Sequence, residues 1–156
     1  MADDRGLRGE VTVSSRFLLE VDGVEIGVFA EVSGLELTVA VDTYEEGGEN
    51  GFSHKLPGRM SWPNLVFKRG ITDSDALFNW VGKSSGPGFA ANGNKVTRST
   101  GAITLLGSDH KRLRAWEIQA AFPVRWTGPR LDVNTTVPLN EELEVAHHGF
   151  RSKTFS

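Results

Sequence analysis

Residues 24–41 of this 156-residue chain read VEIGVFAEVSGLELTVAV. Apolar side chains recur at every second position on both sides of Ser33-Gly34, a period that is typical of β-strands. They are Val24, Ile26, Val28, Ala30 and Val32, followed by Leu35, Leu37, Val39 and Val41. Upstream, Asp22-Gly23 is a hairpin signal after a strand expected at residues 17–21. The first third of the chain is therefore predicted to form an antiparallel meander.

The same alternation predicts three more strands in the second half of the chain. The longest carries Trp116, Ile118, Ala120, Phe122, Val124 and Trp126 on one face. Within it, Pro123 requires a sheet edge, a bend or a bulge, because proline cannot donate to a β-ladder. Shorter strands are expected at residues 100–106 and 139–147, the latter with Leu143, Val145 and His147 on one face and an acidic opposite face.

One segment follows the helical period instead. After Thr72, the apolar residues Ala76, Leu77, Trp80 and Val81 fall on one stripe of a short helix. Thr72 is the predicted N-cap, and the Gly- and Ser-rich stretch from Gly82 ends the helix. Several amphipathic strands with one helix predict a mainly β fold, an antiparallel β-barrel or sandwich with one flanking α-helix.

Length and composition limit the classes of protein that the chain can represent. The length fits a single domain spanning residues 1–156, and zero cysteines exclude thiol catalysis and iron–sulfur clusters. The net charge of −3, with basic residues scattered along the chain, argues against a nucleic-acid-binding surface. We expect no signal peptide and no membrane segment, because no apolar run approaches the ~20 residues that a membrane helix needs. The cytoplasm is the default compartment.

Two stretches are expected to be loops that leave the single domain. Residues 82–99 are rich in Gly, Ser and Asn and show no periodicity. Residues 44–60 form a long connection with Gly47, Gly48 and Gly51 near its centre and Pro57-Gly58 toward its end. Long ordered loops are usually functional, and this one has no evident purpose inside a small monomer.

The groups that could carry chemistry do not form a catalytic constellation. Asp42 with Glu45-Glu46 contains neighbouring carboxylates, but acids in a glycine-rich loop are usually solvated. His147-His148 are adjacent on a predicted strand, so their side chains point to opposite faces and cannot both bind one metal ion. The glycines of residues 47–58 lack the strand–loop–helix context of a phosphate cradle. We therefore expect no enzyme activity, no cofactor and no metal.

Four stretches of the chain, in order, carry a family resemblance. They read FAEVSGL (residues 29–35); YEEGGEN (44–50) with HKLPG (54–58); LVFKRGI (65–71); and AFPVRW (121–126) with EVAHHG (144–149). Their order and spacing resemble the contractile-tail tube family of phage tails and phage-derived extracellular injection systems. The resemblance covers roughly residues 15–150, and the Gly-rich residues 82–99 are its least typical part.

The resemblance implies a structural protein whose protomers share a continuous barrel in a hexameric ring. Stacked rings would form a rigid inner tube inside a contractile sheath, with a baseplate hub and spike at one end and a tube-terminating protein at the other. The lumen would pass DNA or effector protein as cargo. The particle would be assembled in the cytoplasm and be part of a phage virion or an injection particle released from the cell.

Two sets of residues are candidates for roles in such a tube. Glu36, Thr38, Ala40 and Asp42 lie opposite the apolar stripe of their predicted strand and are candidates for the lumen wall. The loop at residues 44–59 is the candidate contact to a neighbouring subunit or the next ring. Its residues for that role are Glu45, Glu46, Gly47, Gly48, Lys55, Pro57 and Gly58.

Two alternatives remain open at the level of sequence. A type six secretion tube and effector carrier would share the architecture, although the motifs match that class less well. A small-ligand-binding β-barrel belongs to another class, and it would be monomeric with an apolar interior pocket.

Overall fold

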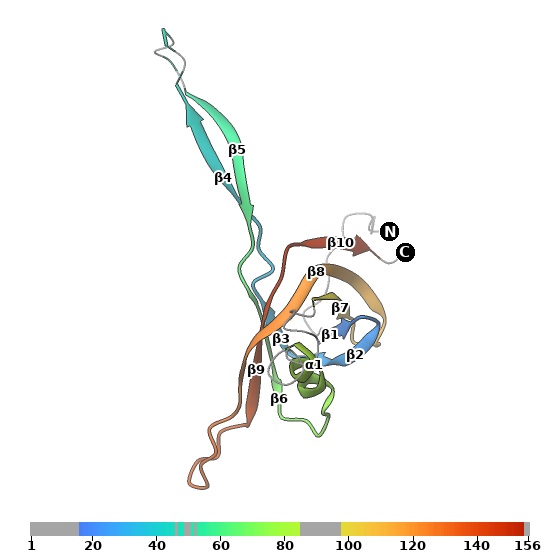
Figure 1. The fold of residues 1–156 in the computed structure, drawn as a ribbon. Helices are drawn as coiled ribbons and strands as arrows, with labels where there is room; N and C mark the ends of the chain where they lie inside the picture. The colour runs from blue at the N-terminus through green and yellow to red at the C-terminus, as the bar shows by residue number, and fades with distance from the viewer. Residues whose placement is uncertain (1–15, 46, 49–50, 52, 85–97, 155–156) are drawn as a thin grey trace, which may run out of the picture.

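The fold was obtained as a computed structural model, which describes residues 16–45, 47–48, 51, 53–84 and 98–154. These residues form ten strands and one helix (Figure 1). The elements are β1 (Arg16–Val21), β2 (Val24–Phe29), β3 (Glu31–Ser33), β4 (Thr38–Tyr44), β5 (His54–Ser61), β6 (Leu65–Gly70), α1 (Ala76–Ser84), β7 (Ser99–Leu106), β8 (Arg112–Thr127), β9 (Asn140–Ala146) and β10 (Phe150–Thr154). The predicted mainly β fold with one helix is confirmed.

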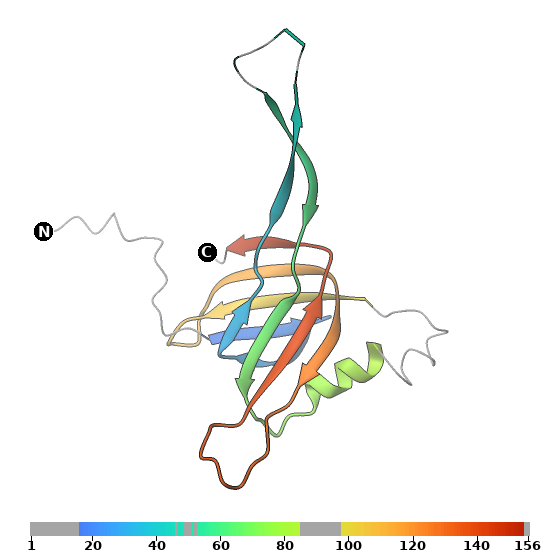
Figure 2. The same cartoon turned by 90° about the vertical axis from the view of Figure 1, so that its left-hand side faces the viewer.

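An antiparallel sheet that folds over on itself makes the body of the molecule. Its strands follow the order β2-β1-β7-β8-β9-β6-β3, and β10 also pairs with β8. The 16-residue β8 links the two halves, since its first part pairs with β7 and β10 and its last part with β9. In Figure 2, β6 and β9 run steeply across the front while β1, β7 and β10 cross behind them. Two layers therefore enclose one core.

Apolar side chains from both layers and from α1 fill this core. Fully buried examples are Leu65 and Phe67 of β6, Leu143 and Val145 of β9, Ile103 of β7, Ile118 of β8 and Leu77 of α1. In β6 and β9 the buried residues are two apart, as expected for strands with one face on the core. Each such side chain contributes roughly 1.5–3 kcal/mol relative to its exposed state.

Bulges change which side of a strand faces the core. The ladder between β8 and β9 shifts register between Pro123 and Arg125, so the irregularity predicted at this proline is confirmed. Ala120 has a φ of 51°, and beyond it Ala121 is buried while Val124 and Trp126 are exposed. The prediction that Trp116 through Trp126 share one face is therefore wrong, because a bulge inverts the alternation that a regular strand would keep.

The first strands show a similar inversion. A shift in the β1–β2 ladder leaves Ile26 and Phe29 buried, while Val24 and Val28 point outward. The β1–β2 hairpin is as predicted, but the rest of the meander is not. Instead, β3 pairs with β6, and β4 pairs only with β5 among the described residues.

The stretch expected to be a loop at residues 44–60 is largely a β-hairpin. β5 occupies His54–Ser61 and pairs with β4 over its length. The resulting two-stranded arm, residues 38–61, projects from the body as a narrow ribbon (Figure 1). The loop prediction is wrong because Pro57 and the nearby glycines are typical loop residues. In a two-stranded ribbon the same residues are tolerated at strand edges and bulges.

The helix is found where it was predicted, with a different cap. The backbone N–H of Asn79 donates to Asp75 O (2.9 Å), which places Asp75 at the N-cap position. Thr72 lies one turn earlier, where its Oγ1 accepts from Ser74 N (3.4 Å). Most of the expected loop at residues 82–99 lies outside the described residues, and its first three residues belong to α1. No helix in the described part of the chain has the length and apolar character to span a membrane.

Candidate functional site

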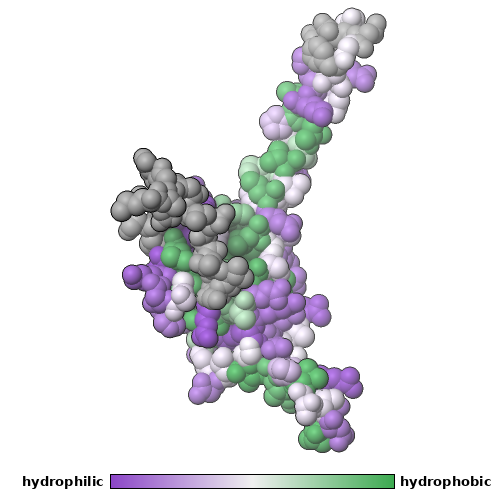
Figure 3. All heavy atoms as spheres, turned by 180° about the vertical axis from the view of Figure 1, so that it is seen from behind, coloured by the Kyte–Doolittle hydropathy of each residue, from purple (hydrophilic) through white to green (hydrophobic). Residues whose placement is uncertain are grey.

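The arm exposes apolar side chains that no part of the described chain covers. Every residue of β4 is exposed, and the exposed fraction of Val41 reaches 60%. Val39 lies directly opposite Met60 and shares a face of β4 with Val41, whereas Tyr44 and Leu56, which lies opposite Asp42, add exposed apolar surface on the other face. Figure 3 shows hydrophobic atoms on the part of the arm that lies nearer the body. Exposed apolar side chains on both faces of a narrow ribbon mark an interaction site.

A two-stranded ribbon cannot supply its own stability. Isolated hairpins are at best marginally stable in water, and among the described residues no third strand pairs with the outer edge of β4 or of β5. The exposed edges offer backbone N–H and C=O groups to another strand. The apolar side chains and the free edges of the arm thus both point to contacts with another chain.

Three of the four candidate lumen residues lie on this arm. Thr38, Ala40 and Asp42 alternate along β4 and share one of its faces, while Glu36 precedes the strand and donates its N–H to Gly34 O (2.8 Å). All four are exposed. Gly58 lies close to the side chains of two of them. A Cβ atom added at this glycine would be 2.9 Å from Asp42 Oδ2 and 3.3 Å from Ala40 Cβ.

The candidate contact residues occupy the outer part of the same arm. Lys55 lies opposite Thr43 and Pro57 opposite Val41, where the register shifts and no proline N–H is needed. Glu45 is exposed at the end of β4, followed by Gly47 and Gly48 in the turn. Gly48 has a φ of 103°, a conformation that glycine adopts without strain. Glu46 lies outside the described residues.

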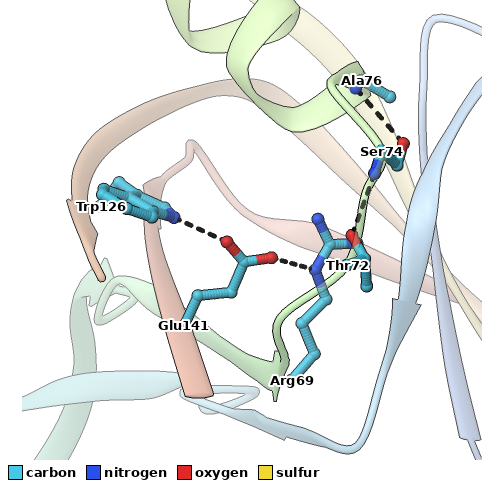
Figure 4. A network of polar contacts seen from close by, with 6 residues as sticks. All are labelled: Arg69, Thr72, Ser74, Ala76, Trp126 and Glu141. Atoms are coloured by element: carbon cyan, nitrogen blue, oxygen red, sulfur yellow. Dashed lines mark hydrogen bonds and ion pairs between the residues drawn. The ribbon is translucent and has the colours of Figure 1, made fainter. Parts of the chain in front are cut away.

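A buried ion pair at the other end of the body was not anticipated. Arg69 Nε and Glu141 Oε1 are 2.5 Å apart, with exposed fractions of 5% and 6% (Figure 4). Trp126 Nε1 donates to the second carboxylate oxygen of Glu141 (3.1 Å), and the Arg69 guanidinium lies 4.7 Å from the centre of the Phe29 ring. Four elements, β2, β6, β8 and β9, are joined through this cluster. Such a pair is held by its mutual hydrogen bonds, since either charge alone would be costly to bury.

A sequence signal for this pair existed. Arg69 continues the apolar alternation of Leu65 and Phe67, and Glu141 precedes Leu143 and Val145 in phase. A charged residue that continues the every-second-position pattern of buried apolar residues is expected to be buried as well. When two strands each carry such a residue, with opposite charges, a buried ion pair is indicated. The pairing of β6 with β9, with Arg69 directly opposite Glu141, brings the two together.

The adjacent histidines lie in the connection between β9 and β10, not on a strand as predicted, and their side chains have different surroundings. His147 is buried, with Nε2 3.0 Å from Pro63 O, and its Nδ1 accepts from the Gly149 N–H (3.1 Å). His148 is exposed and lies 2.6 Å from Arg98 Nη1 through its Nε2. Among the described residues, no three metal-ligating side chains come together.

The architecture is thus an antiparallel β body with a projecting two-stranded arm. Residues 13–151 match the family model described as T4-like virus tail tube protein gp19. The chain belongs to this family of structural tail tube proteins, which confirms the family resemblance and the inner-tube role. A comparison with curated protein sequences returned no match.

Solved structures share the same fold. One is a chain in the sheath–tube complex of the extracellular contractile injection system PVC in its extended state, with a TM-score of 0.76 and 22% identity over 96% of this chain and 95% of that one. Another is a chain in the tube-terminating cap of the anti-feeding prophage, with a TM-score of 0.76 and 21% identity over 99% and 97%. A type six secretion system protein matches with a TM-score of 0.52 and 10% identity over 88% and 82%.

Proposed function

We propose that this chain assembles into hexameric rings that stack into the rigid inner tube of a contractile phage tail or extracellular injection system. The arm carries this proposal, because its exposed apolar residues and free strand edges need neighbouring copies to cover them. Many interchain backbone hydrogen bonds, each contributing about 0.5–1.5 kcal/mol net, would together make the tube stiff. Thrust along the tube would then be shared among them.

The proposed function involves no catalytic turnover and no cofactor. The partners would be further copies of the chain, a contractile sheath, a baseplate hub and spike, a tube-terminating protein, and DNA or effector protein in the lumen. The two similar structures described above, from a sheath–tube complex and from a tube cap, share the fold of this chain and support this set of partners. The chain would assemble in the cytoplasm into a virion or an injection particle.

Glu36, Thr38, Ala40 and Asp42 are proposed to line the lumen. They are exposed, small or acidic, and three of them share one face of β4. Such a face would repel a polyanion and leave a smooth bore. The outer part of the arm, with Glu45, Glu46, Gly47, Gly48, Lys55, Pro57 and Gly58, is proposed to contact a neighbouring subunit or the next ring.

Assembly of the purified chain tests the proposal. We expect concentration-dependent rings and tubes with sixfold symmetry in electron micrographs. Replacing residues 40–59 by a short Gly-Ser turn should leave a folded protomer, because the arm contributes nothing to the core cluster. The shortened protein should form no tubes. Long regular tubes from the shortened chain, or a full-length chain that remains monomeric at all concentrations, would contradict the proposal.

The type six alternative shares the fold but makes a different prediction. Rings of such a protein would be released from cells and would retain effector protein inside them. Recovery of sheathed particles from the native cell would support a phage tail or an injection system. Free rings that carry effector protein and lack a sheath would support the type six alternative.

A further inference from the structure

Stacked identical rings require two different surfaces on each subunit. Contacts between successive rings are heterologous, so one end of the subunit must be complementary to the other end, not to itself. The arm lies at one end of the molecule. The β8–β9 loop, residues 128–139, lies at the opposite end (Figures 1 and 2). This inference rests on the proposed function and names the surface that the arm would meet.

The β8–β9 loop displays apolar side chains in a way that the body does not require. Val133 is 100% exposed at this end of the molecule, and Leu131, Val137 and Leu139 are also exposed. Figure 3 shows hydrophobic atoms at the lower tip of the molecule as well as on the arm. Outside the arm, the apolar side chains with the highest exposed fractions are Val133, Leu131 and Val137, so they gather at the opposite end of the molecule.

The base of the loop is clamped where β8 ends and β9 begins. Trp126 Nε1 donates to Glu141 Oε2 (3.1 Å), and Glu141 is held in turn by Arg69. Ile71 N donates to Leu139 O (3.1 Å), which ties the loop to the end of β6. Gly128 passes over the Trp126 ring, where a Cβ would lie 2.6 Å from the ring carbon Cη2. The buried ion pair therefore also fixes where this loop starts and ends.

Hydrogen bonds within the loop hold its tip in one conformation. Asp132 Oδ1 accepts from Asn134 N (2.9 Å), and Asp132 O accepts from Thr135 Oγ1 (3.2 Å). Pro129 and Pro138 restrict the backbone on each side. A surface already held in its binding conformation loses less entropy when a partner docks. Local hydrogen bonds thus hold the exposed Val133 in place.

The loop is also concave and carries a charge that fits the arm. A cavity of about 440 Å³ is lined by residues that include Arg130, Asp132, Thr135 and Val137. Arg130 is exposed at this cavity, and Glu45 is exposed at the outer end of the arm next to Tyr44. The cavity carries one cation, Arg130, and one anion, Asp132, while the outer end of the arm exposes Glu45 and Lys55, so each charge has an opposite counterpart on the other surface.

We propose that the β8–β9 loop is the receptor for the outer end of the β4–β5 arm of a second copy in the adjacent ring. Val133 and Val137 cover the exposed ring of Tyr44 on the incoming arm, and Arg130 pairs with Glu45. Each subunit gives its arm to one ring and receives an arm from the other. This head-to-tail contact does not close, so it extends the stack ring by ring.

Two sets of variants test this contact. Val133→Asp should leave folding and ring formation intact and abolish stacking, as measured by electron microscopy and sedimentation velocity. Arg130→Glu and Glu45→Arg should each raise the concentration for half-maximal tube assembly by up to about fivefold, the range for an exposed ion pair. The double variant should return to within about twofold of the unmodified chain. Lys111→Glu, the same charge change in the exposed β7–β8 turn, is the control for net charge.

The outcomes separate this inference from the proposed function. The inference is overturned if Val133→Asp forms tubes of normal length, or if the effects of the two charge changes add up in the double variant. In either case, tubes formed by the unmodified chain still uphold the proposed function. A chain that forms neither rings nor tubes overturns both. Folded rings without stacks in Val133→Asp, together with charge rescue, establish the contact.

Discussion

The body and the arm share the same sequence pattern, but its apolar residues are buried in the body and exposed in the arm. Strands β6 and β9 alternate apolar residues, and Leu65, Phe67, Leu143 and Val145 are at most 1% exposed. Strand β4 alternates Val39 and Val41 in the same way, and every residue of it is exposed. Alternation thus specifies a strand with an apolar face, but it does not specify what covers that face. In the body the cover is the opposing layer of the same chain.

The arm differs because its cover is not in the chain. Within the described structure β4 and β5 form strand pairs only with each other, and a hairpin alone is at best marginally stable. Folding of the body and ordering of the arm are therefore expected to be separate events, with the second coupled to assembly. Substitutions can separate the two, because those in the body should change stability and those in the arm should change assembly.

The largest effect is expected at the buried ion pair of the body. Glu141→Ala leaves the Arg69 guanidinium buried without its carboxylate, and we expect the free energy of unfolding to fall by about 3–5 kcal/mol. Denaturant titration of the protomer measures this loss. Glu142→Ala, on the opposite face of the same strand, is the matched control and should change stability by no more than about 0.5 kcal/mol. Equal effects at the two positions would refute the role given to the pair.

An intermediate effect is expected on the apolar stripe of the arm. Val39→Asp with Val41→Asp changes side chains that are already exposed, so the protomer should keep its stability within about 0.5 kcal/mol. Tube assembly should be lost, since charges would be buried without partners at the interface. Sedimentation velocity and denaturant titration, run on the same preparation, separate the two readouts. Normal tubes from this variant would show that the stripe remains in solvent after assembly.

The smallest effect is expected on the other face of the arm. Glu36→Lys with Asp42→Lys reverses two exposed charges, and tubes should still form with protomer stability unchanged within about 0.5 kcal/mol. A reconstruction of these tubes should place both side chains on the lumen wall. Their appearance on the outer wall, or between subunits, would reject the lumen assignment while leaving the arm as an assembly element.

Several features could be predicted from the sequence because their signals are local. Period-two alternation located most strands, and the stripe of Leu77 and Trp80 located the helix. Pro123 predicted an irregularity in β8, since a missing N–H has the same consequence in any sheet. Local dihedral preference and hydrogen-bonding capacity belong to each residue and its near neighbours, so they can be evaluated without a partner strand.

Only the tertiary structure decided which strands pair and which faces are covered. The β4–β5 arm, the inverted faces after Ala120 and the contact of Arg69 with Glu141 all depend on residues distant in sequence or on one-residue register shifts. A shift of one residue moves a side chain to the other face, and the sequence period remains the same on either side of it. The exposed stripe of β4 and the buried stripe of β6 are therefore alike as sequence and differ only by the presence of an opposing layer.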